Sequence, residues 1–368
     1  MKTILFNLND SELEQFVSGL GLPRFRAKQI REWLNRGAPD FSVMKNLPTE
    51  LREKLNEVAE TLPLKIVKKL ESNDNQTTKF LLELNDCEQI ECVLMRTSYG
   101  NSVCVSSQAG CAMGCKFCAS TLLGLKRNLT VNEMFAQVLV AQWELRSDKT
   151  RDIKPNGDAN NGDVSHIVVM GTGEPLQNTE NVIGFLERAN HDLNISWRRI
   201  TVSTCGIVPG IQELNKWGRP INLAISLHAP TDESRSKIMP INNRYKLDEV
   251  LSAAFEFSNT HNRQLMIEYI LLGKRDENGE VVPYNASKED AEKLIKLLRG
   301  HNVMVNLIPW NSVDERDFAS LSGNTVHRFQ DVLINGGIHT RIRRERGADI
   351  GSACGQLRLK NAKKKDTK

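Results

Sequence analysis

The first sixty residues carry apolar side chains at the spacing of amphipathic helices. Apolar positions recur every three or four residues, which predicts helices over 11–20, 23–35 and 48 to about 60. The helical region as a whole is expected to cover residues 1–70. A short stranded segment is expected after it, at about 77–95.

From about residue 100 the pattern changes to apolar, β-branched runs that alternate with amphipathic stretches. The candidate strands are 102–107, 166–170, 199–203, 221–227, 265–272 and 303–309, with a seventh at 338–344. The candidate helices lie near 131–146, 178–190, 207–217, 246–260 and 287–300. Repeated βα units with right-handed crossovers build a parallel sheet or barrel, so the sequence predicts an α/β fold with a partial, TIM-like (βα)6 barrel.

These patterns divide the chain into four expected parts. They are a small N-terminal helical domain (1–70), a stranded linker segment (71–100), the partial barrel (101–310) and a C-terminal strand and loop extension (311–368). The polar stretch 147–163, which is rich in Asn, Asp and Gly, is expected to be a surface loop.

Charge is distributed unevenly along the 368 residues, whose formal net charge is +4. Residues 341–368 contain ten Lys and Arg against three Asp and Glu, which indicates either contact with a polyphosphate or a solvated tail. The basic segment LPRFRAKQIREWLNRG in the N-terminal region has the same two interpretations. The sequence contains no apolar run of membrane-spanning length, and its first residues, with acidic side chains by position 10, are not expected to be a signal peptide. Its eight cysteines indicate a reducing, cytoplasmic location.

Three cysteines in the string CAMGCKFC are the strongest chemical signal. Cys111, Cys115 and Cys118 supply three thiolates at the spacing C-x3-C-x2-C. A structural zinc site would need a fourth ligand with finger-like spacing, and none follows. A [4Fe–4S] cluster held by three cysteines keeps one iron open, which indicates radical chemistry on S-adenosylmethionine (SAM).

Polar and glycine-containing motifs follow the ends of most candidate strands, where parallel barrels carry their active sites. In the motif GTGEP, Gly171 and Gly173 are expected to let the backbone approach a ligand, and Glu174 to accept hydrogen bonds from an ammonium group such as that of SAM. The candidates for contacts with ribose, adenine and carboxylate are Ser203, Ser226, His228 and Asn311. Each of these residues taken singly also suits a cap or a turn.

Seven motifs spread over most of the chain carry a family resemblance. They are CVSSQAGCAMGCKFCAS, MGTGEPL, ITVSTCGI, ISLHAP, MPIN, VNLIPWN and RRERGADIGSACGQL. With them the chain resembles the RlmN/Cfr family of radical-SAM RNA methyltransferases, in particular its RlmN branch. The resemblance implies methylation of adenosine C2 in 23S rRNA at the peptidyl-transferase centre and, in some members, in tRNA just 3′ of the anticodon. It also implies that residues 1–70 bind RNA.

The resemblance further implies a role for individual residues. Cys111, Cys115 and Cys118 match the cluster ligands, and the positions that match SAM contacts are Gly173, Glu174, Ser203, Ser226, Leu227, His228 and Asn311. Cys354 matches the cysteine that first receives a methyl group, and Cys104 matches the partner that releases the adduct and leaves a transient disulfide. A flavodoxin- or ferredoxin-type reductant then resets the pair. Glu91 aligns with the proton acceptor.

Cys104 lies between Val103 and Val105 on a candidate strand, so alternation turns its thiol away from both valines, toward the barrel mouth. Cys87, Cys92 and Cys205 match no role in the family.

Three other interpretations compete with this one. Cfr-type chemistry would methylate adenine C8 with the same cysteines, although Pro175 after Glu174 looks more like RlmN. A silent RNA-binding protein with a structural cluster would not need both Cys104 and Cys354. A ferredoxin-like electron carrier would not leave an iron open. A monomer is the default expectation.

Overall fold

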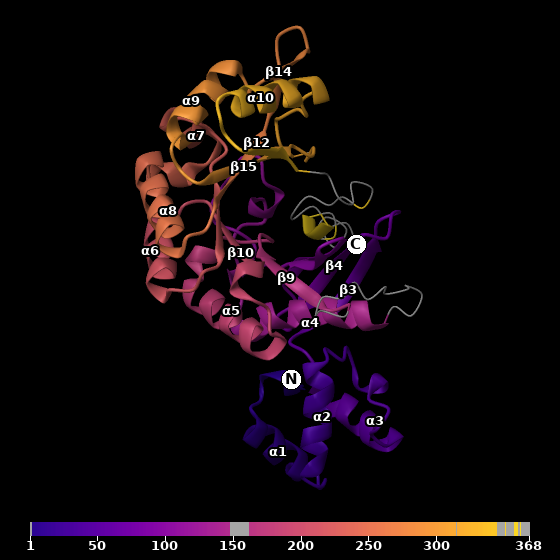
Figure 1. Ribbon diagram of the computed structural model, residues 1–368. Helices are drawn as coiled ribbons and strands as arrows, with labels where there is room; N and C mark the ends of the chain where they lie inside the picture. The colour runs from indigo at the N-terminus through magenta and orange to yellow at the C-terminus, as the bar shows by residue number, and fades with distance from the viewer. Residues whose placement is uncertain are drawn as a thin grey trace.

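The computed structural model describes residues 2–147, 162–313, 315–343, 350, 357–359 and 361. Helices near the N-terminus form a separate group below the main body of the molecule (Figure 1). The main body is one long sheet with helices along its outer side.

The N-terminal group contains three helices and one pair of short strands. The helices are α1 (Asp10–Gly19), α2 (Phe25–Asn35) and α3 (Thr49–Val58), and the strands β1 (Thr3–Ile4) and β2 (Ala59–Glu60) pair in parallel. Helix α1 begins with a capping box, in which Asn9 and Glu12 satisfy each other's backbone N–H groups. The apolar positions that predicted these helices are their buried faces, including Leu13, Ile30 and Leu55. The three predicted helices are therefore confirmed.

Ten strands form the main sheet, in the order β16-β15-β12-β11-β10-β9-β6-β5-β4-β3. The strands before the cysteine motif are β3 (Leu64–Glu71), β4 (Thr77–Leu84), β5 (Gln89–Thr97) and β6 (Gly100–Cys104). Those after it are β9 (Val164–Val169), β10 (Ile200–Thr204), β11 (Asn222–Ser226), β12 (Leu265–Leu271), β15 (Val303–Pro309) and β16 (Thr340–Ile342). Strands β3 to β6 pair antiparallel, and β6 to β16 pair in parallel.

The six parallel strands from β6 to β15 are the predicted partial barrel, and β16 is the predicted seventh strand. Each expected helix is present between them, as α4 (Val131–Ser147), α5 (Thr179–Leu193), α6 (Val208–Trp217), α8 (Leu247–His261) and α9 (Lys288–Leu298). Two helices were not expected, the short α7 (Asp232–Ile238) and α10 (Gly323–Asn335). The remaining strands form two small pairs, β7 (Gln108–Ala109) with β8 (Arg127–Asn128) and β13 (Gly273–Arg275) with β14 (Val281–Pro283).

The stretch from residue 64 to 71 differs from the expectation of a helical region that extends to residue 70. It forms β3, the edge strand of the main sheet. Ile66 and Val67 are β-branched residues that favour a strand, and exposed lysines line an edge that must not pair with another chain. Consequently β3, β4 and β5 continue the barrel sheet at the end where it becomes antiparallel.

The two faces of the sheet differ in what covers them. On one face the thiol of Cys92 in β5 donates a hydrogen bond to the carbonyl oxygen of Gln137 in α4, at 3.7 Å. Side chains alternate between faces along a strand, so the neighbouring Glu91 belongs to the face opposite α4. We call this second face the inner face.

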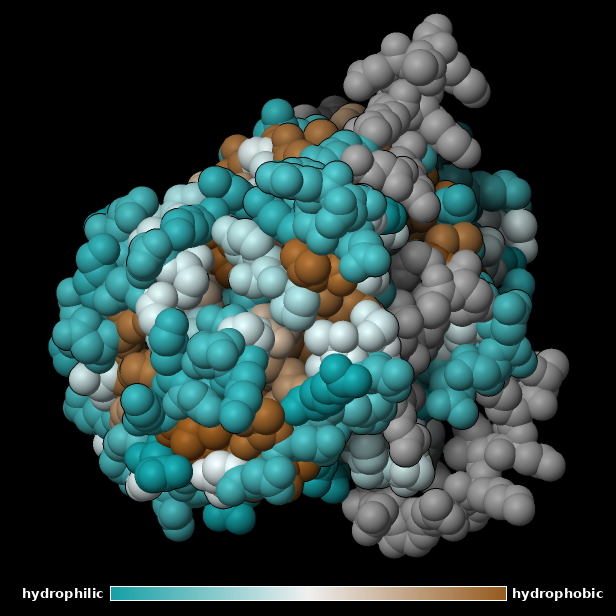
Figure 2. Space-filling view, turned by 90° about the horizontal axis from the view of Figure 1, so that it is seen from above, coloured by the Kyte–Doolittle hydropathy of each residue, from teal (hydrophilic) through white to brown (hydrophobic). Residues whose placement is uncertain are grey.

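None of the helices within the described part of the chain is both long and apolar enough to cross a membrane. The face of the molecule seen in Figure 2 is largely hydrophilic, with hydrophobic residues in separate patches.

Candidate active site

A tightly folded loop after β6 carries the three clustered cysteines. The short strands β7 and β8 fix its two ends. Gly110 has a φ of +91°, and a side chain there would meet the carbonyl oxygen of Gly124 at 1.8 Å, so only glycine fits. The backbone N–H of Cys118 donates to the carbonyl oxygen of Cys115 at 3.2 Å, which closes the last turn. The loop thus holds the three sulfur atoms in one small region.

The three thiols have the properties of ligands for a metal cluster. None of the three forms a disulfide within the described residues, Cys111 and Cys115 are buried and Cys118 is half-buried. Burial raises the pKa of Cys111 to about 12 and also raises that of Cys115, and neighbouring cysteine thiolates would disfavour ionisation of both further. Three thiolates packed this closely need a cationic group between them.

No three His, Cys, Asp or Glu side chains in the described ranges converge on a point that would suit a single metal ion. In an iron–sulfur cube each cysteine binds a different iron, so three ligands surround the cluster and need not meet at one point. The donor set therefore fits a polynuclear cluster better than one ion.

The GTGEP turn after β9 packs directly on the chain that leads from β6 to the cysteines. A Cβ atom at Gly171 would lie 2.7 Å from the backbone nitrogen of Ser106, and one at Gly173 would lie 2.6 Å from the side chain of Gln108. The sequence predicted that these glycines let a ligand approach. In the structure both glycines are needed because the GTGEP turn lies so close to the chain after β6 that a side chain on either glycine would collide with it.

Glu174 ties the ends of two neighbouring strands together. Its carboxylate accepts hydrogen bonds from the hydroxyl of Thr204 at 2.7 Å and from the backbone N–H groups of Cys205 at 2.8 Å and Leu176 at 3.0 Å. Burial raises the pKa of Glu174, and these donors act in the opposite direction. The thiol of Cys205 also lies within hydrogen-bonding reach of this carboxylate, so its acceptor positions are largely occupied within the protein.

Ser203 and Ser226 project from the same face of the sheet as Cys104. The register aligns Cys104 with Val168 and Val168 with Thr201, which lies two residues before Ser203. Ser203 opposes Ala224, two residues before Ser226. Residues directly opposite each other on neighbouring strands share a face, and so do residues two apart on one strand.

Two further polar residues lie on the same face of the sheet, next to Ser226, and the sequence analysis did not select them as candidates. Glu268 of β12 opposes Ser226, and Asn306 of β15 opposes Glu268. The amide of Asn306 donates to Glu268 at 2.9 Å, and burial raises the pKa of Glu268, whereas Arg343 lowers it. Glu268 could have been found from the sequence, because it is a carboxylate inside the apolar run LMIEYIL, and a buried carboxylate needs a partner.

His228 is held in one tautomer next to the cysteine loop. Its backbone has a φ of +62°, and its Nδ1 accepts a hydrogen bond from the backbone N–H of Ile270 at 3.0 Å. Burial, with Arg235 nearby, lowers the pKa of His228 to about 3, so the ring is neutral and its proton is on Nε2. The ring of Phe117, next to Cys118, packs edge-on against it at 4.9 Å between centroids.

Arg235 of α7 is fully buried and was not singled out in the sequence. Its guanidinium donates to the carbonyl oxygens of Leu227 at 3.0 Å, Cys205 at 2.6 Å and Ser226 at 3.1 Å. It therefore joins the ends of β10 and β11. Its positive charge also interacts favourably with Cys115.

Asn311 follows β15 in a segment that packs on the cysteine loop. The indole N–H of the preceding Trp310 donates to the carbonyl oxygen of Phe117 at 3.2 Å, and Arg316 donates to that of Cys118 at 2.7 Å. Asn311 itself is half-buried. The last of the strand-end motifs thus lies beside the cysteines that begin the site.

Glu91 and Cys104 lie on the inner face at the antiparallel end of the barrel. Val93 opposes Cys104, and Glu91 lies two residues before Val93 on β5. Glu91 is paired with Lys79 at 2.8 Å and accepts a hydrogen bond from the backbone N–H of Arg358 at 2.7 Å. Alternation predicted that Cys104 turns away from its valine neighbours, and the register agrees with this.

Cys354 lies outside the described residues, and so does most of the basic tail. No disulfide joins any two of the seven cysteines within the described ranges. The C-terminal residues 357–359 dock next to Glu91, where Arg358 also forms an ion pair with Glu88 at 3.0 Å.

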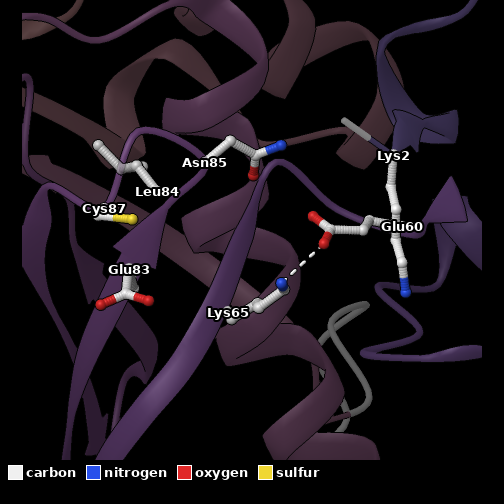
Figure 3. Close-up of a pocket in the computed structure, with 7 residues that line it drawn as sticks. All are labelled: Lys2, Glu60, Lys65, Glu83, Leu84, Asn85 and Cys87. Carbon is white, nitrogen blue, oxygen red and sulfur yellow. Dashed lines mark hydrogen bonds and ion pairs between the residues drawn. The ribbon is translucent and has the colours of Figure 1, made fainter.

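A small cavity lies away from these residues, between the N-terminal group and the β4–β5 turn (Figure 3). Lys2, Glu60, Lys65, Glu83, Leu84, Asn85 and Cys87 line it. Lys65 and Glu60 form an ion pair across it at 2.7 Å. It contains none of the predicted site residues.

Comparison with known proteins places these features in a family. Residues 3–61 match the model "Ribosomal RNA large subunit methyltransferase N-terminal domain", and residues 105–282 match the model of the radical SAM superfamily. A crystal structure of a radical SAM methyltransferase from Sphaerobacter thermophilus has a TM-score of 0.79 and 38% sequence identity, over 96% of this chain and 98% of that one. The fold is therefore the radical-SAM fold.

Two full-length relatives are named "Probable dual-specificity RNA methyltransferase RlmN". The one from Clostridium acetobutylicum is 44% identical over 97% of both chains, and the one from Clostridium botulinum strain Eklund 17B is 46% identical over 100% of this chain and 99% of the relative. The chain belongs to the RlmN family of radical-SAM RNA methyltransferases.

Proposed function

We propose that this enzyme methylates C2 of an adenosine in 23S rRNA at the peptidyl-transferase centre and of the tRNA adenosine just 3′ of the anticodon. The observation that carries the proposal is the shared inner face, where Glu91 and Cys104 lie on the same sheet surface as the strand-end residues around the cysteine loop. The full-length similarity to dual-specificity RNA methyltransferases supports both substrates.

Radical-SAM enzymes use SAM and a [4Fe–4S] cluster, and we assign the cluster to Cys111, Cys115 and Cys118. When bound, these cofactors supply the one-electron chemistry that a methyl transfer to an aromatic C–H carbon requires. For SAM we assign Gly173, Glu174, Ser203, Ser226, Leu227, His228 and Asn311 as contacts. Neutral His228 can donate from Nε2, and Glu174 supplies a carboxylate near the ends of two strands for an ammonium group.

Three residues handle the methyl group and the base. Cys354 accepts the methyl group on its sulfur, and the one-electron chemistry named above removes one hydrogen atom from that methyl group, so that its carbon can bond C2 of adenine. Glu91 takes the proton that leaves C2, and the electron left on the base returns to the cofactors. The Cys104 thiol then attacks the sulfur of Cys354, so that the S–C bond breaks and an S–S bond forms, and the thiol's proton goes to the released carbon, which becomes the methyl group of the base. Two electrons from a flavodoxin- or ferredoxin-type reductant return the disulfide to two thiols.

The N-terminal helices and the basic C-terminal end are assigned to the RNA backbone, because clustered Lys and Arg neutralise phosphates. We place the reaction in the cytoplasm and expect a monomer. Methylation at C8 by Cfr-type chemistry is the alternative, and Pro175 after Glu174 favours C2.

Nucleoside mass spectrometry tests the proposal. The enzyme with its reconstituted cluster is incubated with SAM, reductant and unmodified ribosomal RNA and tRNA. We expect 2-methyladenosine in both RNA pools and none with Cys354→Ala, whose cluster absorbance should be unchanged. A product of 8-methyladenosine would contradict the C2 assignment, and methylation by the Cys354→Ala variant would contradict the S-methylcysteine route.

A further inference from the structure

Lys79 of β4 is a fully buried lysine next to the proposed proton acceptor. Its side chain is 0% exposed and that of Glu91 is 4% exposed, and the ammonium nitrogen lies 2.8 Å from Glu91 Oε2. Lysine is almost never buried completely unless a charged partner accompanies it. The flanking residues Thr78 and Phe80 are also fully buried, so this charge lies deep in the sheet.

The register places Lys79 on the same face as the proposed reaction. Lys79 opposes Val93 of β5, and Val93 opposes Cys104 of β6. Glu91 lies two residues from Val93 and thus shares this face. Lys79, Glu91 and Cys104 therefore share the inner face, with Val93 between Cys104 and the Lys79–Glu91 pair.

Both oxygens of the Glu91 carboxylate are held by donors. Lys79 binds Oε2, and the backbone N–H of Arg358 donates to Oε1 at 2.7 Å. Two donors on different elements fix the plane of the carboxylate. A further contact, from the hydroxyl of Ser106 to the backbone carbonyl oxygen of Glu91 at 2.6 Å, fixes the strand itself.

A buried carboxylate without a nearby positive charge takes up a proton, because burial disfavours its charged form. A protonated Glu91 could not accept another proton from the base. The ammonium group of Lys79 supplies the charge that favours the ionised form.

We propose that Lys79 is a positioning residue of the methylation reaction, which keeps Glu91 ionised and oriented for proton transfer. The proposal rests on the proposed role of Glu91. In the step concerned, the C–H bond of the base breaks, an O–H bond forms on Glu91, and the electron pair of the C–H bond stays with the base. Lys79 keeps its own protons throughout.

A double-mutant cycle on the reconstituted enzyme tests the proposal. The variants are Lys79→Met, which removes the charge at similar length, Glu91→Gln, their combination, and Lys79→Arg, which restores the charge. Lys69→Met is the matched control, because Lys69 lies on the neighbouring β3 and forms an exposed ion pair with Glu144. The rate of adenosine methylation in unmodified 23S rRNA is measured by nucleoside mass spectrometry.

Two readouts separate this role from a purely structural one. Formation of S-methylcysteine at Cys354, measured by peptide mass spectrometry, needs no proton acceptor on the base and should be unchanged in every variant. The infrared carbonyl band of a protonated carboxylic acid should appear with Lys79→Met and be absent from wild type and from the double variant.

We expect Lys79→Met to lower the methylation rate about 100-fold or more, and Lys79→Arg to restore most of it. The double variant should be no slower than Glu91→Gln alone, because Lys79 acts through Glu91. If Lys79→Met does not fold, Lys79→Gln is the second uncharged variant, with the same expectation.

The outcomes distinguish the two proposals. A wild-type rate for Lys79→Met together with a slow Glu91→Gln would overturn the role of Lys79 and leave the proposed function intact. Additive effects in the double variant would also overturn it. A wild-type rate for Glu91→Gln would overturn the role of Glu91 itself, and the role of Lys79 with it.

Discussion

Arg235 connects more backbone segments of the candidate site than any side chain singled out in the sequence. It binds the carbonyl oxygens of three residues at the ends of β10 and β11, and its remaining nitrogen donates to Asn242 at 3.0 Å. Periodicity could not identify it, because ESRSKI reads as an exposed helical turn. Its burial depends on carbonyl groups that are distant in the sequence.

Replacing Arg235 with Met should destabilise the protein by roughly 3 kcal/mol or more, because several buried carbonyl oxygens lose a charged donor. The midpoint of denaturant unfolding measures this. Lys237→Ala on the same helix is the control, and its midpoint should not change, because Lys237 is exposed and pairs only with Glu233 in the adjacent turn. Equal midpoints for both variants would contradict the role of Arg235.

His228 makes the stability of the fold depend on pH. Its folded-state pKa of about 3 lies below the value of 6.5 for an exposed histidine, so the unfolded chain binds the additional proton between these values. The neutral ring contributes its full stabilisation above pH 6.5, and this is lost progressively as the pH falls toward 3. At pH 5 the loss should be about 2 kcal/mol.

The variant His228→Asn isolates this effect. Asparagine tolerates the left-handed backbone and offers an acceptor for the N–H of Ile270, but it does not titrate. Unfolding midpoints measured from pH 7 to pH 5 should fall less steeply for the variant than for wild type. Parallel curves would show that His228 does not cause the pH dependence.

At the scale of elements, the alternation of strands and helices could be predicted from the sequence, but the register in which the strands pair could not. The predicted strands of the parallel sheet agree with the observed ones to within a few residues, because buried parallel strands are continuous apolar runs. Helix α10 was missed although Val326, Phe329 and Leu333 have helical spacing. The close packing of the GTGEP turn on β6 could not be read from the sequence, because it depends on how two segments meet.

That packing predicts that Gly171→Ala destabilises the protein by about 1–3 kcal/mol, since the new methyl group would lie 2.7 Å from a backbone nitrogen. The unfolding midpoint and the iron content after reconstitution should both decrease. Gly323→Ala is the matched control, because a side chain there would meet nothing within 4 Å and lies in a helix. An unchanged midpoint for Gly171→Ala would mean that the turn adjusts without cost.

At the scale of the whole molecule, the fold class and the cysteine loop were predictable, and the shared inner face was not. The spacing of Cys111, Cys115 and Cys118 is local, so the sequence contains it. Glu91, Cys104 and Ser226 share one surface only because ten strands pair in a particular order. The expected stranded linker likewise gave no sign that β3 to β5 would extend the sheet and bring Lys79 to the site.

The hydrogen bond between Arg358 and Glu91 joins residues 267 positions apart. A growing chain folds its N-terminal parts first, so β5 can enter the sheet long before Arg358 has been synthesised. Glu91 therefore gains the donor from Arg358 only after 267 further residues have been synthesised. A chain that stops before Arg358 would contain the barrel and the cysteine loop, yet its Glu91 carboxylate would lack this donor.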